Sequence, residues 1–306
     1  MAYDYQLDFN GLVMGDGTLY DVVDWSGLEE FSTRNTDTAI PAGWGAIGGS
    51  SFVDARVATI VVECLDPTAV VLLEAGLTPA PLSAPATLYP VRWKFPNREE
   101  LVAYGRVARR SRPRTVTTAL GLTQVTFELE LPDPRAYAYV ASNLSAPVYF
   151  AGTTVLDLAT GSGGGLGFDL TVDATTNLGF DFGGIAPSGQ VAATNAGDVE
   201  TFPVVTFTVA GGLVGQWSLT NLTTGGVLAL GGALNPGDTL IVDCRPVNTG
   251  ATAITPVLLN GVSAFAYWQA PRVPLALVPG ANLLQLDVQS GSGTLSGLVS
   301  WQSAYL

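Results

Sequence analysis

Paired carboxylates are the first residues to consider for catalysis in this sequence. Three such pairs stand close together along the chain: Glu29/Glu30, Glu99/Glu100 and Glu128/Glu130. A glycosidase needs two carboxylates roughly 5 to 10 Å apart across a cleft, and the last pair shares one face of an expected strand. Acids on a face turned to solvent or to a partner are ordinarily just solvated, so we expect no catalytic residue and no enzyme.

The chain contains no histidine, which removes the commonest general base and metal ligand together with the histidine-dependent nucleophiles. Its two cysteines, Cys64 and Cys244, lie near the ends of separate apolar runs, and we predict two unconnected buried thiols. The glycine cluster GSGGGLG at 161–167 lacks the Lys-Ser/Thr ending of a phosphate loop, and no helix follows it. We therefore expect no metal and no cofactor.

Three tryptophans in the second half could serve as stacking surfaces for a sugar: Trp217, Trp268 and Trp301. Sugar binding needs an aromatic platform beside converging polar groups. Trp217 and Trp301 alternate with polar residues inside expected strands, which is the usual pattern of core aromatics. Carbohydrate binding is therefore the alternative function rather than the leading one.

Glycine (36 residues) and proline (19) punctuate the chain, and short apolar runs between them predict an all-β fold. The expected strands cover 55–65, 123–131, 202–211, 216–222, 238–244, 282–288 and 297–306. One helix is predicted at 67–77, where Asp66 can cap the start, Pro67 suits the first position and Gly76 can end it.

The segment 131–150 is the predicted boundary between two domains, 1–140 and 141–306. Prolines on both sides of Asp133 stop a strand, and 11 of the 13 basic residues precede the boundary. The second domain has the regularly spaced strands of a two-sheet sandwich. No window is apolar and long enough for a membrane span, and the acidic N-terminus does not resemble a signal peptide. Membrane insertion and signal-dependent secretion are therefore not expected.

Many short segments, in this order and spacing, resemble the distal tail proteins of long-tailed phages that infect actinobacteria. In the first half they are YQLDFNGLVMGDGTLYDVVDWSGLEE, GWGAIGGSSFVDARVATIVVEC, PVRWKFPNREELVAYGRVARRSRP and ELELPDPRAYAY. In the second they are NAGDVETFPVVTFTV, LTNLTTGGVLAL, LNPGDTLIVDCRPVNT, LLNG, LVPGANLLQLD and LVSWQSAYL. The resemblance covers nearly the whole chain.

This resemblance implies an N-terminal split β-barrel of the tail-tube type, followed by a galectin-like β-sandwich. It also implies a structural virion protein at the phage tail tip, assembled in the host cytoplasm. Its copies would form a ring, usually a hexamer, that connects the tail tube protein to tail-tip, hub or tape-measure-associated proteins. DNA would pass through the central channel without specific binding. The alternative is a carbohydrate-binding adhesion module of the same tail tip.

Four arginines stand within ARRSRPR, residues 108–114, although the formal net charge of the chain is −13. A nucleic-acid binder normally has a basic domain, whereas 11 basic and 17 acidic residues leave 1–140 with a net charge of −6. Strand alternation keeps one face apolar as far as Val107, and both faces are charged from Arg109. We therefore expect the strand to leave the core there and its arginines to pair with carboxylates.

Those carboxylates could belong to the neighbouring FELELPD strand or to an adjacent copy of the chain. Guanidinium groups suit interface carboxylates, and a ring needs two complementary patches. The family resemblance implies that the long 31–49 segment reaches toward a neighbouring copy or the tube. A tryptophan in its middle would then insert into a pocket of that partner. The hypothetical subunit interface consists of Arg106, Arg109, Arg110, Arg112, Arg114, Trp44, Asp21, Asp24, Glu29 and Glu30.

Overall fold

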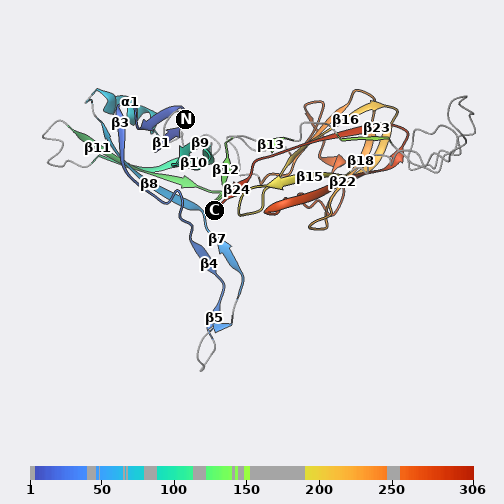
Figure 1. The fold of residues 1–306 in the computed structure, drawn as a ribbon, viewed down its shortest axis with the longest axis horizontal. Helices are drawn as coiled ribbons and strands as arrows, with labels where there is room; N and C mark the ends of the chain where they lie inside the picture. The colour runs from blue at the N-terminus through green and yellow to red at the C-terminus, as the bar shows by residue number, and fades with distance from the viewer. Residues whose placement is uncertain are drawn as a thin grey trace, which may run out of the picture.

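The computed structural model describes residues 4–39, 46–47, 49–64, 66, 68–78, 88–112, 122–139, 142–143, 148–151, 190–246 and 256–306. Over these ranges the chain is built almost entirely of antiparallel strands, which confirms the predicted all-β class. The first and second halves lie end to end, and a thin two-stranded arm projects between them (Figure 1). No helix in these ranges is long and apolar enough to cross a membrane.

The first half wraps one continuous path of antiparallel strands around a core. The path runs β2-β1-β9-β10-β11-β8-β3, and β12 joins it beside β10. Its strands are β1 (Gln6–Phe9), β2 (Leu12–Gly15), β3 (Tyr20–Ser26), β8 (Arg56–Cys64), β9 (Tyr89–Lys94), β10 (Leu101–Ser111), β11 (Thr123–Leu131) and β12 (Ala136–Ala138). Leu7, Trp93 and Phe127 are fully buried at its centre.

Strand β10 belongs to two sheets, because its first part pairs with β9 and its second part with β11. Gly105 lies where the strand changes partners. A Cβ atom at this position would come within 2.4 Å of Leu131 Cδ2 and 2.9 Å of the Glu130 carbonyl oxygen. A side chain here would force its neighbours to shift, so glycine suits this close approach of the strands.

The single α-helix of the described chain, α1 (Ala69–Gly76), confirms the predicted helix. It buries Ala69, Val70 and Leu73 against the first core, and Asp66 accepts a 2.8 Å hydrogen bond from the Thr68 amide just before it. The two cysteines are free and buried, one in each half, as the sequence predicts.

The second half contains two facing sheets around a separate core, the arrangement expected for the second domain. One sheet runs β23-β16-β19-β20-β21 with β13 and β14 beside β23, and the other runs β15-β22-β17-β18. The elements are β13 (Ser142–Asn143), β14 (Val148–Ala151), β15 (Gln190–Asn195), β16 (Val204–Gly211), β17 (Val214–Asn221), β18 (Gly226–Leu234), β19 (Thr239–Asp243), β20 (Val257–Leu259), β21 (Val262–Ser263), the 3-10 helix η1 (Phe265–Tyr267), β22 (Gly280–Gly291) and β23 (Thr294–Trp301).

The end of the chain crosses the predicted boundary. The sequence predicts one strand over 297–306, but the structure separates β23 from β24 (Ala304–Tyr305), which pairs with β12 in the first half. Beside this pair, Gln302 Nε2 donates a 2.8 Å hydrogen bond to the Ala138 carbonyl, and the Ala138 amide donates one of 2.9 Å to the Ser303 carbonyl. Strand pairing and side-chain hydrogen bonds thus join the two halves.

The arm is formed by the long segment that the sequence analysis singles out. Its inner pair is β4 (Thr33–Asn35) with β7 (Ser51–Val53), and its outer pair is β5 (Thr38–Ala39) with β6 (Ala46–Ile47). The arm projects from the body (Figure 1). Trp44 and the glycine cluster at 161–167 lie outside the described residues.

Candidate subunit-interface surfaces

Most of the predicted interface residues that the structure describes belong to one four-stranded part of the first-half sheet. Its order is β10-β11-β8-β3. Strand β3 pairs with β8 alone and the second part of β10 pairs with β11 alone, as far as the chain is described. The basic strand and the acidic strand are therefore the two open edges of the same sheet.

A β-bulge in β10 brings two of the arginines to one face. Arg106 lies opposite Glu130, Val107 opposite Leu129 and Arg109 opposite Glu128, so Ala108 is the extra residue. Bulges shift the alternation of side chains by one position. Strict alternation predicts Arg106 and Arg109 on opposite faces of the strand. Because of the bulge, both side chains instead lie on the face of the sheet that points away from the core, called the outer face below.

A second bulge, in β3, brings two aspartates to one face at the other edge of the sheet. Asp21 lies opposite Glu63 and Asp24 opposite Val61, which leaves Val23 as the extra residue of β3. Glu63 and Val61 alternate with the fully buried Val62, so they point outward. Asp21 and Asp24 therefore share the outer face with Arg106 and Arg109, at the opposite edge of the sheet.

The acidic edge carries charges that nothing in the described part of the chain neutralises. Asp21 and Glu63 are directly opposite each other, and like charges in that position are unfavourable. None of Asp21, Asp24 and Glu63 takes part in an ion pair among the described residues. A cationic group beside β3 would relieve this repulsion.

The arginines of the other edge have partners within the chain. Arg106 Nη2 lies 2.8 Å from Glu130 Oε2, and Arg109 Nη1 lies 3.5 Å from Glu128 Oε1. The carboxylates that pair with Arg106 and Arg109 thus come from the neighbouring strand of the same sheet. The side chain of Arg109 nevertheless remains 71% exposed, and exposed pairs of this kind contribute little stability. It can still reach a second carboxylate.

The remaining arginines turn toward the helix. Arg110 donates to the backbone carbonyl of Glu74 at the end of α1, and Arg112 Nη1 lies 3.8 Å from Glu74 Oε1. The burial pattern of β10 becomes exposed from Ala108 onward, as the sequence predicts. Arg114 lies outside the described residues.

Glu29 and Glu30 follow β3 at the root of the arm and are not part of the sheet face. Glu29 already forms a 2.9 Å ion pair with Arg98, whereas Glu30 is exposed. Beside them, at the root and along the arm, Phe31 and Phe52 are about half exposed. These two aromatic residues were not predicted from the sequence, where only Trp44 was singled out.

The three tryptophans proposed for sugar stacking are buried, which corrects that assignment. Trp217, Trp268 and Trp301 are 1%, 5% and 6% exposed. Trp217 packs edge-on against Phe207, and the Trp301 Nε1 atom donates a 3.0 Å hydrogen bond to the Thr194 carbonyl. Their rings belong to the core of the second half and offer no platform to a ligand. In the described ranges no three metal-binding side chains converge either.

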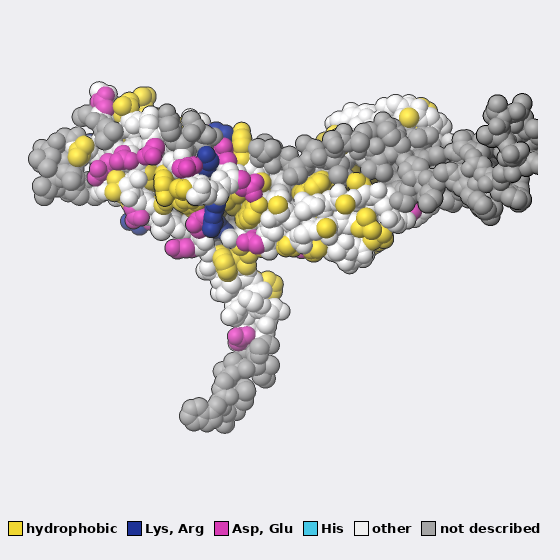
Figure 2. All heavy atoms as spheres, in the orientation of Figure 1, with side chains coloured by type: hydrophobic (Ala, Val, Ile, Leu, Met, Phe, Trp, Pro, Cys, Tyr) yellow, Lys and Arg dark blue, Asp and Glu magenta, His cyan; other side chains and the backbone are white. Residues whose placement is uncertain are grey.

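Charged side chains gather on the first half, while the visible face of the second half is mostly polar and uncharged with scattered apolar groups (Figure 2). This agrees with the position of 11 of the 13 basic residues before residue 140. Electrostatic contacts therefore concentrate on the sheet described above and around the root of the arm.

No protein-family model and no curated protein matches the chain, but solved structures do. The crystal structure of the Dit protein of phage SPP1 matches with a TM-score of 0.58 at 13% identity, over 99% of this chain and 100% of that chain. This chain has a Dit-like fold. A chain of the phage P2 baseplate, in its activated conformation with Ca, matches with a TM-score of 0.51 at 9% identity over 98% of both chains. At such identities the likeness establishes the fold alone.

Proposed function

We propose that this protein is a structural component of a virion: a distal tail protein whose copies form a ring, six in number by the family resemblance. The observation that carries this is the Dit-like fold along the whole chain. SPP1 Dit is described as a paradigm of the hub adsorption apparatus of phages that infect Gram-positive hosts. By the same analogy the ring connects the tail tube to tip and hub proteins of a long-tailed actinobacteriophage, and it catalyses no reaction.

The two open edges supply the ring contact. Side by side, the β3 edge of one copy and the β10 edge of the next bring Asp21 and Asp24 close to Arg106 and Arg109. The arginines relieve the repulsion between Asp21 and Glu63, and unpaired backbone groups of both edges find partners. Such a contact is heterologous, and it closes into a ring when the rotation between copies permits.

The outer face of this sheet is suited to the wall of a DNA channel. Five acids outnumber two arginines on it: Asp21, Asp24, Glu63, Glu128 and Glu130 against Arg106 and Arg109. Proteins that hold DNA neutralise phosphates with a surplus of basic groups, and this face has a deficit. DNA would therefore pass without specific binding.

The two halves, each with its own core, have different roles in this proposal. Residues 1–140 form the ring, and residues 141–306 form a galectin-like sandwich carried outside it. The arm reaches toward a neighbouring copy or the tube. No observation favours the carbohydrate-binding alternative, because its proposed stacking residues are buried.

Mass photometry of the purified chain, followed by negative-stain microscopy, tests the proposal. The expected particle has about six times the 31.7 kDa mass of one chain, with a central hole. A monomer at all accessible concentrations, also when mixed with tail-tube protein, would contradict the connector role.

A further inference from the structure

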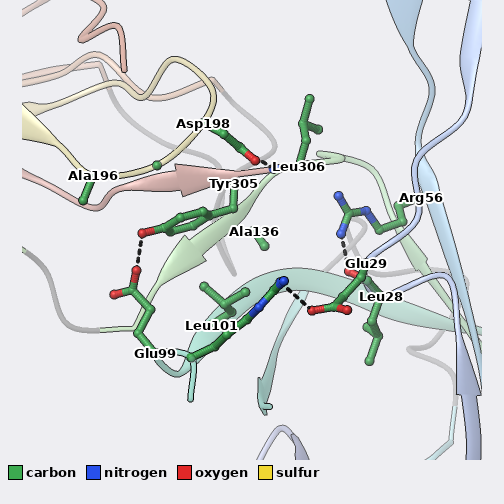
Figure 3. Close-up of a pocket in the computed structure, with 12 residues that line it drawn as sticks. Leu28, Glu29, Arg56, Glu99, Leu101, Ala136, Ala196, Asp198, Tyr305 and Leu306 are labelled. Carbon is green, nitrogen blue, oxygen red and sulfur yellow. Dashed lines mark hydrogen bonds and ion pairs between the residues drawn. The ribbon is translucent and has the colours of Figure 1, made fainter. Parts of the chain in front are cut away.

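A cavity of about 630 Å³ opens where the two halves meet the root of the arm. Its wall comes from six separate parts of the chain: the segment after β3, the start of β8, the turn into β10, β12, the 196–198 segment and the chain from β24 onward (Figure 3). Glu29 was predicted from the sequence as an interface residue, but the other segments were not predicted to form a site. The cavity is also distinct from the sheet edges of the proposed ring contact.

Among the described residues, Arg56 is the charged group of this wall that has no carboxylate partner. Its side chain is 4% exposed, and Nη1 donates to the Leu28 carbonyl. Nε and Nη2 are screened from solvent and have no hydrogen-bond partner among the described residues. These two nitrogens form the side edge of the guanidinium, which binds a carboxylate through two parallel hydrogen bonds. Donors left unpaired away from water are unfavourable.

The acids that line the cavity already have other partners. Glu29 pairs with Arg98 at 2.9 Å, and Glu99 accepts a hydrogen bond from the Tyr305 hydroxyl. Asp198 Oδ1 accepts a 2.9 Å hydrogen bond from the Leu306 amide. Figure 3 shows these contacts around the cavity and the guanidinium of Arg56 turned toward its middle. The cavity thus contains one buried cation whose charge is balanced only at a distance.

We propose that this cavity binds a carboxylate group, which pairs with the Nε and Nη2 edge of Arg56. A single hydrogen bond holds the guanidinium, so turning its free edge into the cavity breaks no other hydrogen bond. A monoanionic carboxylate fits better than phosphate, because three acids and two arginines leave the lining with a net formal charge of −1. A dianion would be repelled more strongly.

The carboxylate can come from an acidic side chain of a neighbouring protein chain or from a free small acid. Both present the same group to Arg56. The inference does not depend on ring formation, since every residue of the cavity belongs to one chain.

Saturation-transfer NMR on the full-length protein tests the site with N-acetyl-aspartate amide and its neutral isostere N-acetyl-asparagine amide. We expect binding of the first compound and not of the second, and no displacement by phosphate at equal ionic strength. Arg56→Lys retains the positive charge but lacks the two-pronged edge, so it should bind roughly tenfold more weakly. Arg34→Lys, in the arm and outside the cavity, is the matched control and should bind like the wild type.

A second variant keeps the test decisive if Arg56→Lys unfolds. Ala196 is exposed and lines the cavity, so Ala196→Trp fills the space and leaves Arg56 in place; binding should be lost. Equal binding of both compounds, displacement by phosphate, or unchanged binding in either variant would overturn the proposal. Titration of N-acetyl-aspartate amide into dilute and into assembled protein then separates the two sources of the carboxylate. Binding that is lost on assembly indicates that a neighbour's side chain occupies the cavity. Binding that is retained in both states indicates a free acid.

Discussion

Arg109 lies opposite Glu128, on the same outer face as Arg106, because Ala108 forms a β-bulge. The bulge at Val23 gives Asp24 the same relationship to Asp21 on the other edge strand. Two extra residues, one at each edge, therefore point all four charges to the same side of one sheet. In the proposed ring, this arrangement would set arginines beside aspartates at every contact.

Removing the repulsion between Asp21 and Glu63 should have opposite effects on the stability of a single chain and on the assembly of the ring. Asp21→Asn should stabilise the monomer by about 0.2 to 1 kcal/mol, because it removes one of two like charges in directly opposite positions. It should also weaken the ring. Urea unfolding at low protein concentration measures the first effect, and mass photometry measures the second. Asp16→Asn removes an equal charge in the turn before β3 and should change neither.

The hydrogen bond between Tyr137 and Asp133 lies within the first half, beside the pairing of β12 with β24. Tyr137 is 5% exposed, and its hydroxyl lies 2.6 Å from the buried carboxylate. Tyr137→Phe should lower the free energy of unfolding by about 1 to 3 kcal/mol, as expected for a buried hydrogen bond to a charged group. Tyr139→Phe is the control, since this ring is 45% exposed. Equal effects of the two substitutions in urea unfolding would argue against the role of the buried pair.

The buried Cys244 thiol should make stability fall at alkaline pH. Burial raises the pKa of Cys244 from 9.0 to about 12. Between these values the unfolded chain releases the proton while the folded chain retains it, so the free energy of unfolding decreases as pH rises. Cys244→Ala has no thiol at this position and lacks this pH dependence. The difference in free energy of unfolding between wild type and variant should therefore shrink as pH rises from about 8 to about 11, because only the wild type loses this contribution. Parallel stability curves from urea unfolding would contradict the prediction.

The arm should be dispensable for folding and required for assembly. None of its described residues belongs to either buried core, and the Asp54 amide donates a 2.9 Å hydrogen bond to the Ser32 carbonyl at its root. A short Gly-Ser linker can therefore replace residues 33–53 without spreading the ends. The melting temperature should stay close to that of the wild type, while ring or tube binding is lost. A large drop in melting temperature would instead assign the arm a role in the fold.

Alternation and glycine-proline punctuation were enough to predict seven strand regions, the helix and the point at which β10 leaves the core, but not strands such as β1, β2 and β12. The bulges could not be predicted, because Ala108 and Val23 have no distinctive residue type and register depends on the partner strand. For the same reason the return of β24 to the first half was missed. Arg56 was included in an ordinary strand, since its isolation becomes visible only when the arm root and the 196–198 segment meet around it.

Mixing two charge-reversed variants is the most direct test of the ring contact. Arg106→Glu/Arg109→Glu makes both edges acidic, and Asp21→Arg/Asp24→Arg makes both edges basic; circular dichroism checks that each variant folds. Mass photometry should find each variant alone unassembled at a concentration where the wild type forms rings. An equimolar mixture should restore rings, because alternating copies recover opposite charges at every contact. Rings formed by each variant alone, or a mixture that stays unassembled, would contradict the account.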